Sequence, residues 1–245
     1  MGLRITLLLS LAAVALAPIA VLGWASRPLL AEVRRQRIAE FEELARPSFN
    51  LFDRAAAEVT EGVRGFQQGI GQRNLDLAKL AREERWWGKK RDLERLRAVL
   101  ERLAERAGLE SVIVRTGAET LYAWAPAAGD APPEAAKPGL APGWRWDPDE
   151  DVVRYMHALP VSAAVGGPPI TVAGWRSWPR PELAGRLRAR LGEPAGVAVE
   201  LRGRLPGSLP LDPEPGVLVR ELRSPRGEAT VAAVIDARGL EVPMA

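Results

Sequence analysis

Cysteine is absent from this chain of 245 residues, and histidine occurs only once. Without thiols the chain cannot form disulfides, cysteine-based zinc sites or a cysteine nucleophile. A serine hydrolase would have to use His157 as its base, and the sequence has no Gly-x-Ser-x-Gly turn to present a serine to it. We therefore predict no catalytic residue in this chain.

Long runs of one charge are also missing. The formal net charge is +3, and the 34 basic and 31 acidic residues are interspersed along the chain. Proteins that bind nucleic acids usually concentrate their basic residues in an arm or a patch. We expect no nucleic-acid partner.

Motifs for metals and nucleotides are equally scarce. The acidic stretch DPDED (Asp147–Asp151) lacks the spacing and the central glycine of a calcium loop, so it is interpreted as an exposed turn. Gly62, Gly65 and Gly69 follow no strand and precede no Lys-Ser pair, which excludes a phosphate loop. Their helical spacing predicts a smooth helix face against which a neighbour packs closely. We expect no metal and no cofactor.

One long uncharged run is present, from Ile5 to Trp24. At about 1.5 Å per residue, a helix of roughly twenty residues covers the ~30 Å hydrocarbon core of a bilayer. A signal peptide usually has a shorter apolar core, and the small residues at 15–17 are followed by Pro18. We expect a retained transmembrane anchor over residues 1–25, with a cleaved signal peptide as the alternative. Because the run begins at residue 5, we place the bulk of the chain outside the cytoplasm, on the periplasmic side of the inner membrane.

The next part of the chain has helical periodicity. Apolar residues recur every three or four positions from Phe49 to Ile70, which is typical of a helix that packs along its length against another helix. An earlier helix is expected to end before Pro47, and a third, from Leu93, to end at Gly108. We predict a helical stalk over residues 26–90. Helices within 28–107 would form either an intramolecular bundle or a homodimer.

Beyond Gly108 the apolar period changes to two, and turn residues separate short segments. A loop is expected over 126–143 and a short helix over 181–191. This order predicts an α+β fold with an antiparallel sheet in a domain over residues 91–240, followed by a tail over 241–245. The expected strands are 110–116, 119–125, 152–161, 170–178, 196–203, 216–224 and 228–237.

The stretch GEATVAAVIDARGL, from Gly227 to Leu240, has a glycine turn before an apolar strand that ends in aspartate. With the amino-terminal anchor, the long helix and the strand order, it resembles the extracytoplasmic sensor region of bacterial transmembrane receptors, chiefly sensor histidine kinases. The resemblance implies a PAS-like or Cache fold and a role in two-component signal transduction. It also implies a second membrane helix and a kinase, which would carry the enzymatic activity. The sequence does not include them, so either a truncated receptor or a stand-alone sensor is expected.

Arg176-Ser177-Trp178 is similar to the Arg-x-Trp element that lines amino-acid pockets in some Cache domains. An arginine fork between aromatic walls suits a carboxylate, so we predict a site for a small anionic or amino-acid-like ligand. Aromatic residues at alternating positions are also typical of a core, which is the alternative interpretation. The predicted ligand-binding residues are Trp146, Arg154, Tyr155, Arg176 and Trp178.

Two functions therefore remain. The first is a membrane-anchored sensory module of a two-component receptor. The second is a non-signalling adaptor of the cell envelope, tethered by the same anchor, whose helical stripe binds a partner protein.

Overall fold

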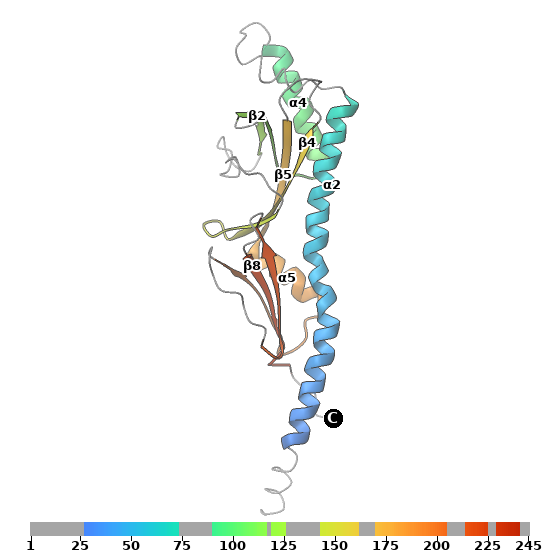
Figure 1. Ribbon diagram of the computed structural model, residues 1–245, viewed down its shortest axis with the longest axis vertical. Coiled ribbons are helices and arrows are strands. Elements are labelled where there is room, and N and C mark those ends of the chain that lie inside the picture. Colours follow the sequence, from blue (N-terminus) through green and yellow to red (C-terminus); the bar gives the residue numbers. More distant parts are fainter. Residues whose placement is uncertain are drawn as a thin grey trace, which may run out of the picture.

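The computed structural model describes seven stretches of the chain. They form one elongated molecule in which a long helix runs beside two sheets (Figure 1). The predicted anchor over 1–25 and the tail over 241–245 lie outside the described residues. The described ranges are 27–73, 90–116, 119–125, 143–161, 170–204, 214–224 and 229–240.

The long helix consists of a helix over residues 27–45, a 3-10 turn η1 (Arg46–Phe49) and α2 (Asn50–Gln72). The first α-helix ends at Ala45, before Pro47 as expected, and the 3-10 turn follows it directly. Proline lacks an N–H and so cannot continue the α-helical hydrogen-bond ladder, but it is tolerated among the first residues of the 3-10 turn, where that N–H has no partner to bind. The backbone N–H of Asn50 instead donates to the Pro47 carbonyl, and the chain continues in the same direction.

The apolar stripe of α2 is buried, as its periodicity predicts. The residues that cover this stripe lie on strands as well as on a helix. Side chains such as Phe52 and Phe66 share one core cluster with the strand residues Val153 and Val172, and also with Leu100 of α4 (Lys90–Arg106). Burying a phenylalanine contributes roughly 1.5–3 kcal/mol, so this seam accounts for much of the attachment of the helix to the sheets.

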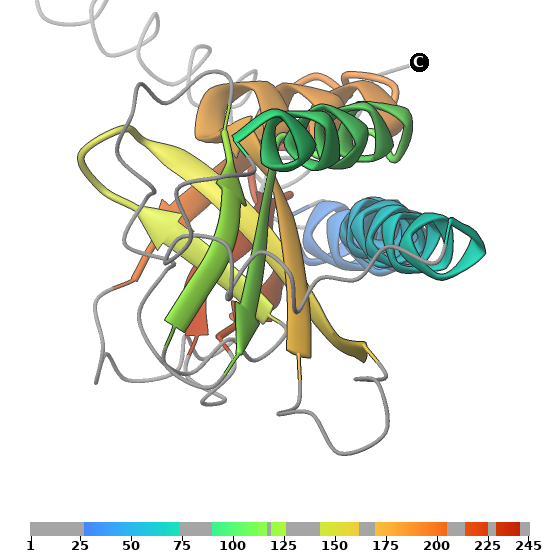
Figure 2. The ribbon, with the colours of Figure 1, turned by 90° about the horizontal axis from the view of Figure 1, so that it is seen from above.

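The larger sheet has five antiparallel strands in the order β2-β1-β5-β4-β3. Each alternates in sequence between two faces, so one face packs on the long helix. Figure 2 shows α2 and α4 beside this sheet. The strands are β1 (Ser111–Thr116), β2 (Glu119–Trp124), β3 (Gly143–Asp147), β4 (Val152–Val161) and β5 (Ile170–Pro179).

The opposite face of this sheet carries a second, smaller apolar cluster. Ile113, Met156, Ala173 and Trp175 are all buried there, and Ala158 packs against them. These residues alternate along their strands with those that face the helix. Both faces of the five-stranded sheet are therefore apolar.

The smaller sheet has three antiparallel strands in the order β6-β8-β7 and is preceded by the short helix α5 (Arg180–Arg190). Leu183 and Leu187 of α5 are buried, and Gly192 follows the helix with a positive φ of 73° that glycine adopts without strain. The strands are β6 (Ala198–Gly203), β7 (Val217–Arg223) and β8 (Ala229–Asp236).

The prediction of an α+β fold with antiparallel strands is confirmed. The sequence-based expectation differs from the structure in two respects. The strands form two sheets instead of one, and β3 occupies 143–147, next to the segment expected to be a loop. β3 was missed because it has only five residues and because its first residue, Gly143, was assigned to the preceding loop.

Contacts between described residues hold the two sheets together at the end of the larger one. Trp146 of β3 lies directly on Gly203 of β6, where an added Cβ would come within 2.3 Å of the indole ring. Arg180 donates to the Leu201 carbonyl at 2.7 Å. Thr230 of β8 donates from its hydroxyl to the Trp144 carbonyl at 3.3 Å.

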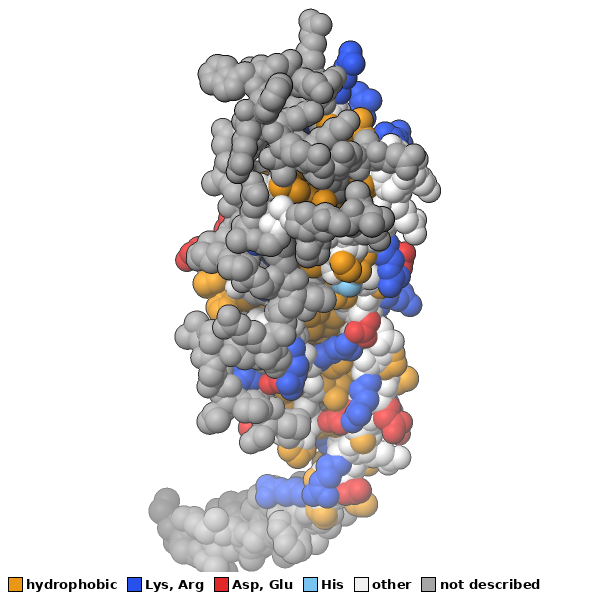
Figure 3. Space-filling view, turned by 45° about the horizontal axis from the view of Figure 1, so that its top comes forward, with side chains coloured by type: hydrophobic (Ala, Val, Ile, Leu, Met, Phe, Trp, Pro, Cys, Tyr) orange, Lys and Arg blue, Asp and Glu red, His pale blue; other side chains and the backbone are white. Residues whose placement is uncertain are grey.

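No helix among the described residues combines the length and the apolar composition that a membrane crossing requires. The predicted anchor falls on residues that the structure does not describe, so it stays a prediction. On the face drawn in Figure 3, basic and acidic side chains alternate over the described surface.

Candidate functional site

The structure divides the five predicted ligand-binding residues between the two faces of the larger sheet. Tyr155 lies opposite Arg176 in the register of β4 and β5, and Trp178 is two residues further along the same face. Trp146 is on this helix-facing side too, whereas Arg154, next to Tyr155 in sequence, is on the other side. Arg176, Trp178 and Tyr155 therefore come together, and Arg154 does not join them.

Arg176 lies between the sheet and the long helix. Its guanidinium NH1 is 3.4 Å from a carboxylate oxygen of Glu58 on α2, and its Nε is 4.0 Å from Glu110, just before β1. The guanidinium carbon lies 5.8 Å from the centre of the Trp178 ring. The arginine side chain remains 38% exposed, so solvent and solutes reach it.

The aromatic residues next to Arg176 form a packed cluster. Trp144 lies 5.0 Å from Tyr155, 5.8 Å from Trp178 and 6.0 Å from Phe52 between ring centres. Trp178 is only 3% exposed. The alternative interpretation of these aromatics as core residues agrees with this packing, which also fixes the orientation of the Trp178 ring beside Arg176.

The other two predicted residues have structural contacts. Trp146 packs at the joint between the sheets, against Gly203. Arg154 binds two of the four acids in the preceding DPDED stretch: its NH1 is 2.7 Å from Asp147, and its NH2 contacts Glu150. Its Nε also donates to the Ser177 hydroxyl at 3.3 Å.

The DPDED stretch is a turn, as the sequence predicts, and arginines neutralise it. Burial by itself would raise the pKa of Asp147, but the backbone N–H of Glu150 and the Arg154 guanidinium outweigh it and hold that pKa below its ordinary value. Asp151 accepts a two-pronged contact from Arg180, which lowers the pKa of its carboxyl. Among the described residues, no group of three or more histidine and acidic side chains is arranged to hold a metal ion.

His157 lies on β4, at the strand position that the sequence predicts, and faces the long helix. It is opposite Gly174 in the register, and both of its ring nitrogens are enclosed without a hydrogen-bond partner among the described residues. Burial, and then the charge of Arg64 on α2, lower the pKa of His157. A neutral, enclosed imidazole beside an arginine agrees with a structural role for this residue.

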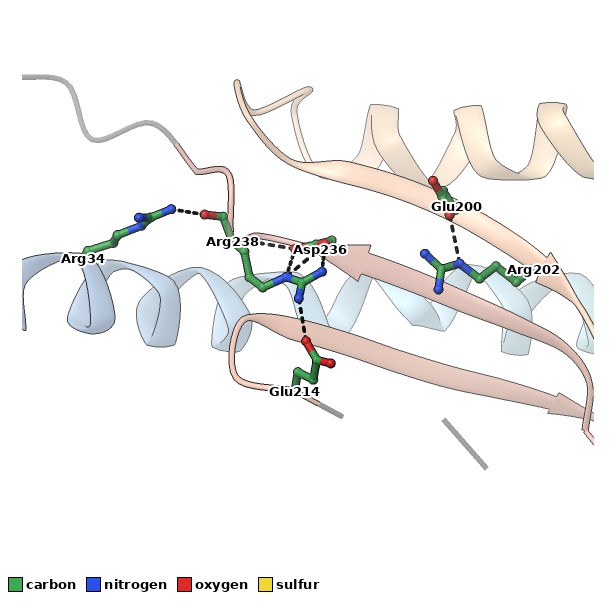
Figure 4. Close-up of polar contacts among 6 residues, drawn as sticks. All are labelled: Arg34, Glu200, Arg202, Glu214, Asp236 and Arg238. Carbon is green, nitrogen blue, oxygen red and sulfur yellow. Dashed lines mark hydrogen bonds and ion pairs between the residues drawn. The ribbon is translucent and has the colours of Figure 1, made fainter. Parts of the chain in front are cut away.

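A second group of polar contacts ties the end of the described chain to the start of the long helix. Arg238, just after β8, binds Asp236 at 2.6 Å and Glu214 at 2.5 Å, and its carbonyl accepts a hydrogen bond from Arg34 (Figure 4). Glu42 of the same helix accepts the backbone N–H of Gly216 at 2.9 Å. We call this group the end clasp.

Sequence reasoning missed Glu58 and Glu110 as partners of Arg176. Glu58 is 118 positions away in the chain and lies off the apolar stripe, as many solvated acids do. Nothing in its local sequence distinguishes it from Glu61, which pairs with Arg64 one turn away on the same helix. The partner could be found only from the three-dimensional packing.

No protein-family model matches the chain. No curated protein matches it either. Among solved structures, the periplasmic domain of LuxQ from Vibrio cholerae is similar, with 14% sequence identity and a TM-score of 0.42, over 77% of this chain and 98% of that one. At so low a TM-score and identity, the similarity carries no argument about this chain.

Proposed function

We propose that this chain is the sensory, ligand-binding part of a bacterial two-component receptor. In this proposal residues 1–25 anchor it in the inner membrane, the rest lies on the periplasmic side, and a second membrane helix and a histidine kinase belong to the complete receptor. The five-stranded antiparallel sheet backed by a long helix agrees with the PAS-like or Cache domain that the sequence resemblance implies.

The observation that carries the proposal is the position of Arg176 between two elements. It extends from β5 and pairs with Glu58 of the long helix, at a distance of 3.4 Å and with both side chains partly exposed. Exposed ion pairs contribute roughly 0.2–1 kcal/mol, so a carboxylate in solution can compete with Glu58 for the guanidinium. Arginine suits this exchange because its fork binds carboxylates in a two-pronged geometry.

A ligand carboxylate that takes the place of Glu58 would remove one link between the sheet and the long helix. The ligand then favours a state in which the helix has moved relative to β5. The difference in the ligand's affinity for the two states sets how far the population moves toward that state. Trp178 provides a fixed ring beside the guanidinium, and Tyr155 lies across from it in the register. Because the helix starts beside the end clasp, its movement would reach the membrane-facing end.

This site contains three of the five predicted residues: Tyr155, Arg176 and Trp178. Arg154 and Trp146 contribute indirectly, through the turn before β4 and the joint between the sheets. The expected ligand is a small carboxylate, because Glu58 and Glu110 repel a ligand of higher charge until they are displaced.

Thermal unfolding in the presence of a panel of amino acids and small carboxylates tests the proposal. At about ten times its Kd, a ligand stabilises the folded chain by about 1.4 kcal/mol. We expect at least one carboxylate to raise Tm, and we expect Arg176→Ala to abolish that rise while leaving Tm without ligand nearly unchanged.

Arg186→Ala is the matched control, because Arg186 is another half-exposed arginine that pairs with an acid, Glu182, on α5. This variant should keep the full ligand response. A panel without any stabilising carboxylate, or a response that persists in Arg176→Ala, would contradict the proposed site.

A further inference from the structure

The start of the long helix projects beyond the rest of the described chain. Figure 1 shows its first turns extending past the end of the smaller sheet. Leu29 is 69% exposed, Leu30 57% and Val33 45%, and these are three of the four large apolar side chains that stay exposed among the described residues. Single exposed leucines are ordinary, but three apolar side chains within five positions form a patch that marks a contact surface.

The three apolar residues lie on one side of the helix. At 3.6 residues per turn, positions 29, 30 and 33 fall within about 100° of one another around the helix axis, and Arg37 follows Val33 by one turn on the same side. A different side is already occupied, because Arg34 and Glu42 contact the end clasp. We call the side formed by Leu29, Leu30, Val33 and Arg37 the projecting face.

The charges around the projecting face are mostly positive. Residues 27–37 contain four arginines and one acid, Glu32, which lies on another side of the helix and pairs with Arg35 at 3.1 Å. Among the described residues, none forms an ion pair with Arg37. The next acid on the projecting face is Glu40, about one turn after Arg37. Up to that point the face is apolar and basic, which suits a surface that carries negative charge over an apolar interior.

The predicted anchor places this face near lipid. Its uncharged run ends at Trp24, three residues before the described helix begins. The headgroup layer on each side of a bilayer is roughly 5–8 Å thick, whereas an upright helix would carry Val33 about 14 Å beyond Trp24. All sides of an upright helix would then meet the same surroundings. An apolar patch on one side therefore favours a helix that leaves the membrane at a slant, with that side toward the lipid.

A second copy of the chain suits the projecting face less well. In a parallel pair of helices, equal positions of the two copies lie side by side, so Arg37 would lie next to Arg37. A phospholipid surface offers phosphate groups to the arginine and acyl chains to the leucines.

We propose that the chain rests on its membrane through the projecting face. Leu29, Leu30 and Val33 enter the boundary between headgroups and acyl chains, and Arg37 binds the phosphate of an anionic phospholipid. The contact ends at Glu40, which phosphate repels. Leu44, beyond that point, is a single exposed leucine of the ordinary kind.

This contact rests on the predicted anchor of the proposed receptor and not on ligand binding at Arg176. The end clasp holds another side of the same helix. The lipid contact therefore sets the position of the helix start, and of the end of the described chain clasped to it, relative to the membrane.

The absence of cysteine allows the slant to be measured with single labels on the full chain in vesicles of phosphatidylcholine and phosphatidylglycerol. Val33→Cys places a fluorophore on the projecting face. Ala31→Cys is the matched control, because position 31 is also exposed and lies about 200° away around the axis and about 3 Å away along it. Lipids that carry a nitroxide quench a fluorophore in the bilayer, and iodide quenches one in water. Lipid quenching should be at least about threefold stronger at Val33→Cys than at Ala31→Cys, and iodide quenching should be weaker.

Charge reversal tests the phosphate contact. In the Val33→Cys background, Arg37→Glu should reduce lipid quenching at least about twofold in vesicles with phosphatidylglycerol, and by less in vesicles of phosphatidylcholine alone. Arg102→Glu is the matched control: Arg102 is an exposed arginine on α4, away from the projecting start of the long helix (Figure 1). This variant should keep the quenching of the parent. Both variants should keep the Tm of the parent, because the substituted side chains are exposed.

Equal lipid quenching at positions 31 and 33 would mean an upright helix and would overturn the proposal. So would protection of Val33→Cys from both quenchers, which would mean that protein covers the face, for example a second copy. An Arg37→Glu variant that behaves like Arg102→Glu would contradict the phosphate contact. A chain that does not float with the vesicles would overturn the lipid contact together with the anchor, whereas the response of Tm to carboxylates tests the Arg176 site separately.

Discussion

The arginines of the larger sheet differ in how firmly they are held. Arg154 makes contacts with two acids and a hydroxyl, and no ligand is needed to satisfy it. Arg176 has two carboxylates at 3.4 and 4.0 Å and an aromatic ring beside it. Longer contacts to exposed partners are weaker. Arg176 is therefore the residue of the predicted set at which a solute can exchange with a side chain of the chain itself.

His157, also a single residue, leads to a prediction about how the stability of the fold depends on pH. Its folded-state pKa lies below its ordinary value of 6.5, because burial and Arg64 disfavour the charged imidazole. The unfolded chain therefore binds more protons as the pH falls below about 6.5, and the free energy of unfolding decreases in that window. Tyr155 and Arg176, on the same sheet face, and Glu61, paired with Arg64, are the other ionisable groups nearby.

We expect Tm to fall between pH 7.5 and pH 5.5 in the parent chain and to fall less in His157→Gln. Thermal unfolding of both proteins at the two pH values measures the difference. An equal drop in parent and variant would assign the pH dependence to other groups.

Some residues of the candidate site could be identified from the sequence, and others could not. Arg176 and Trp178 were identified because an arginine two positions from a tryptophan is a local pattern. Glu58 and Glu110 could not be identified, because their role depends on which elements lie side by side. The division of Arg154 and Tyr155 between two faces follows from strand alternation alone, so a strand register assigned from the sequence would have separated them.

At the scale of elements, periodicity predicted the helices and strands well and their partners less well. The stripe of α2 was expected to pack on another helix, but it packs on strands of the larger sheet as well as on α4. A 3.6-residue period shows that a helix has one buried face and does not show what covers it. The 3-10 turn at Pro47 was missed because proline was expected only to end a helix.

The glycines of α2 provide a graded test of this packing. A Cβ at Gly62 would lie 2.6 Å from the backbone carbonyl oxygen of Ala107, and a Cβ at Gly69 would lie 2.6 Å from the end of the Leu103 side chain. At Gly65 the space is open. The predicted close approach is thus found at two of the three glycines.

We expect Gly65→Ala to raise the free energy of unfolding by up to about 1 kcal/mol, because alanine favours the helix and meets nothing. Gly62→Ala should lower it by about 1–3 kcal/mol, since a backbone carbonyl cannot move aside. Gly69→Ala should fall between them, because the Leu103 side chain can rotate. Urea unfolding, monitored by circular dichroism, measures the order of the three free energies of unfolding. A destabilised Gly65→Ala would contradict this packing.

At the scale of the whole molecule, the long helix links everything else. Both sheets lie along it, and the end clasp returns the last described residues to its beginning (Figures 1 and 4). The sequence indicated the α+β class and the order of elements. It could not show that the strands divide into two sheets, because that depends on contacts such as Trp146 on Gly203 between segments distant in the chain.

This architecture makes the contact between helix and sheet the point at which a ligand would act. If a carboxylate competes with Glu58 for Arg176, then removing the competitor must favour the ligand. The most direct measurement is the Kd of the stabilising carboxylate for the parent chain and for Glu58→Gln, by titration calorimetry. Competition predicts binding about two- to fivefold tighter in Glu58→Gln, which corresponds to the roughly 0.4–1 kcal/mol of an exposed ion pair. Unchanged or weaker binding in Glu58→Gln would contradict the proposed competition between Glu58 and the ligand.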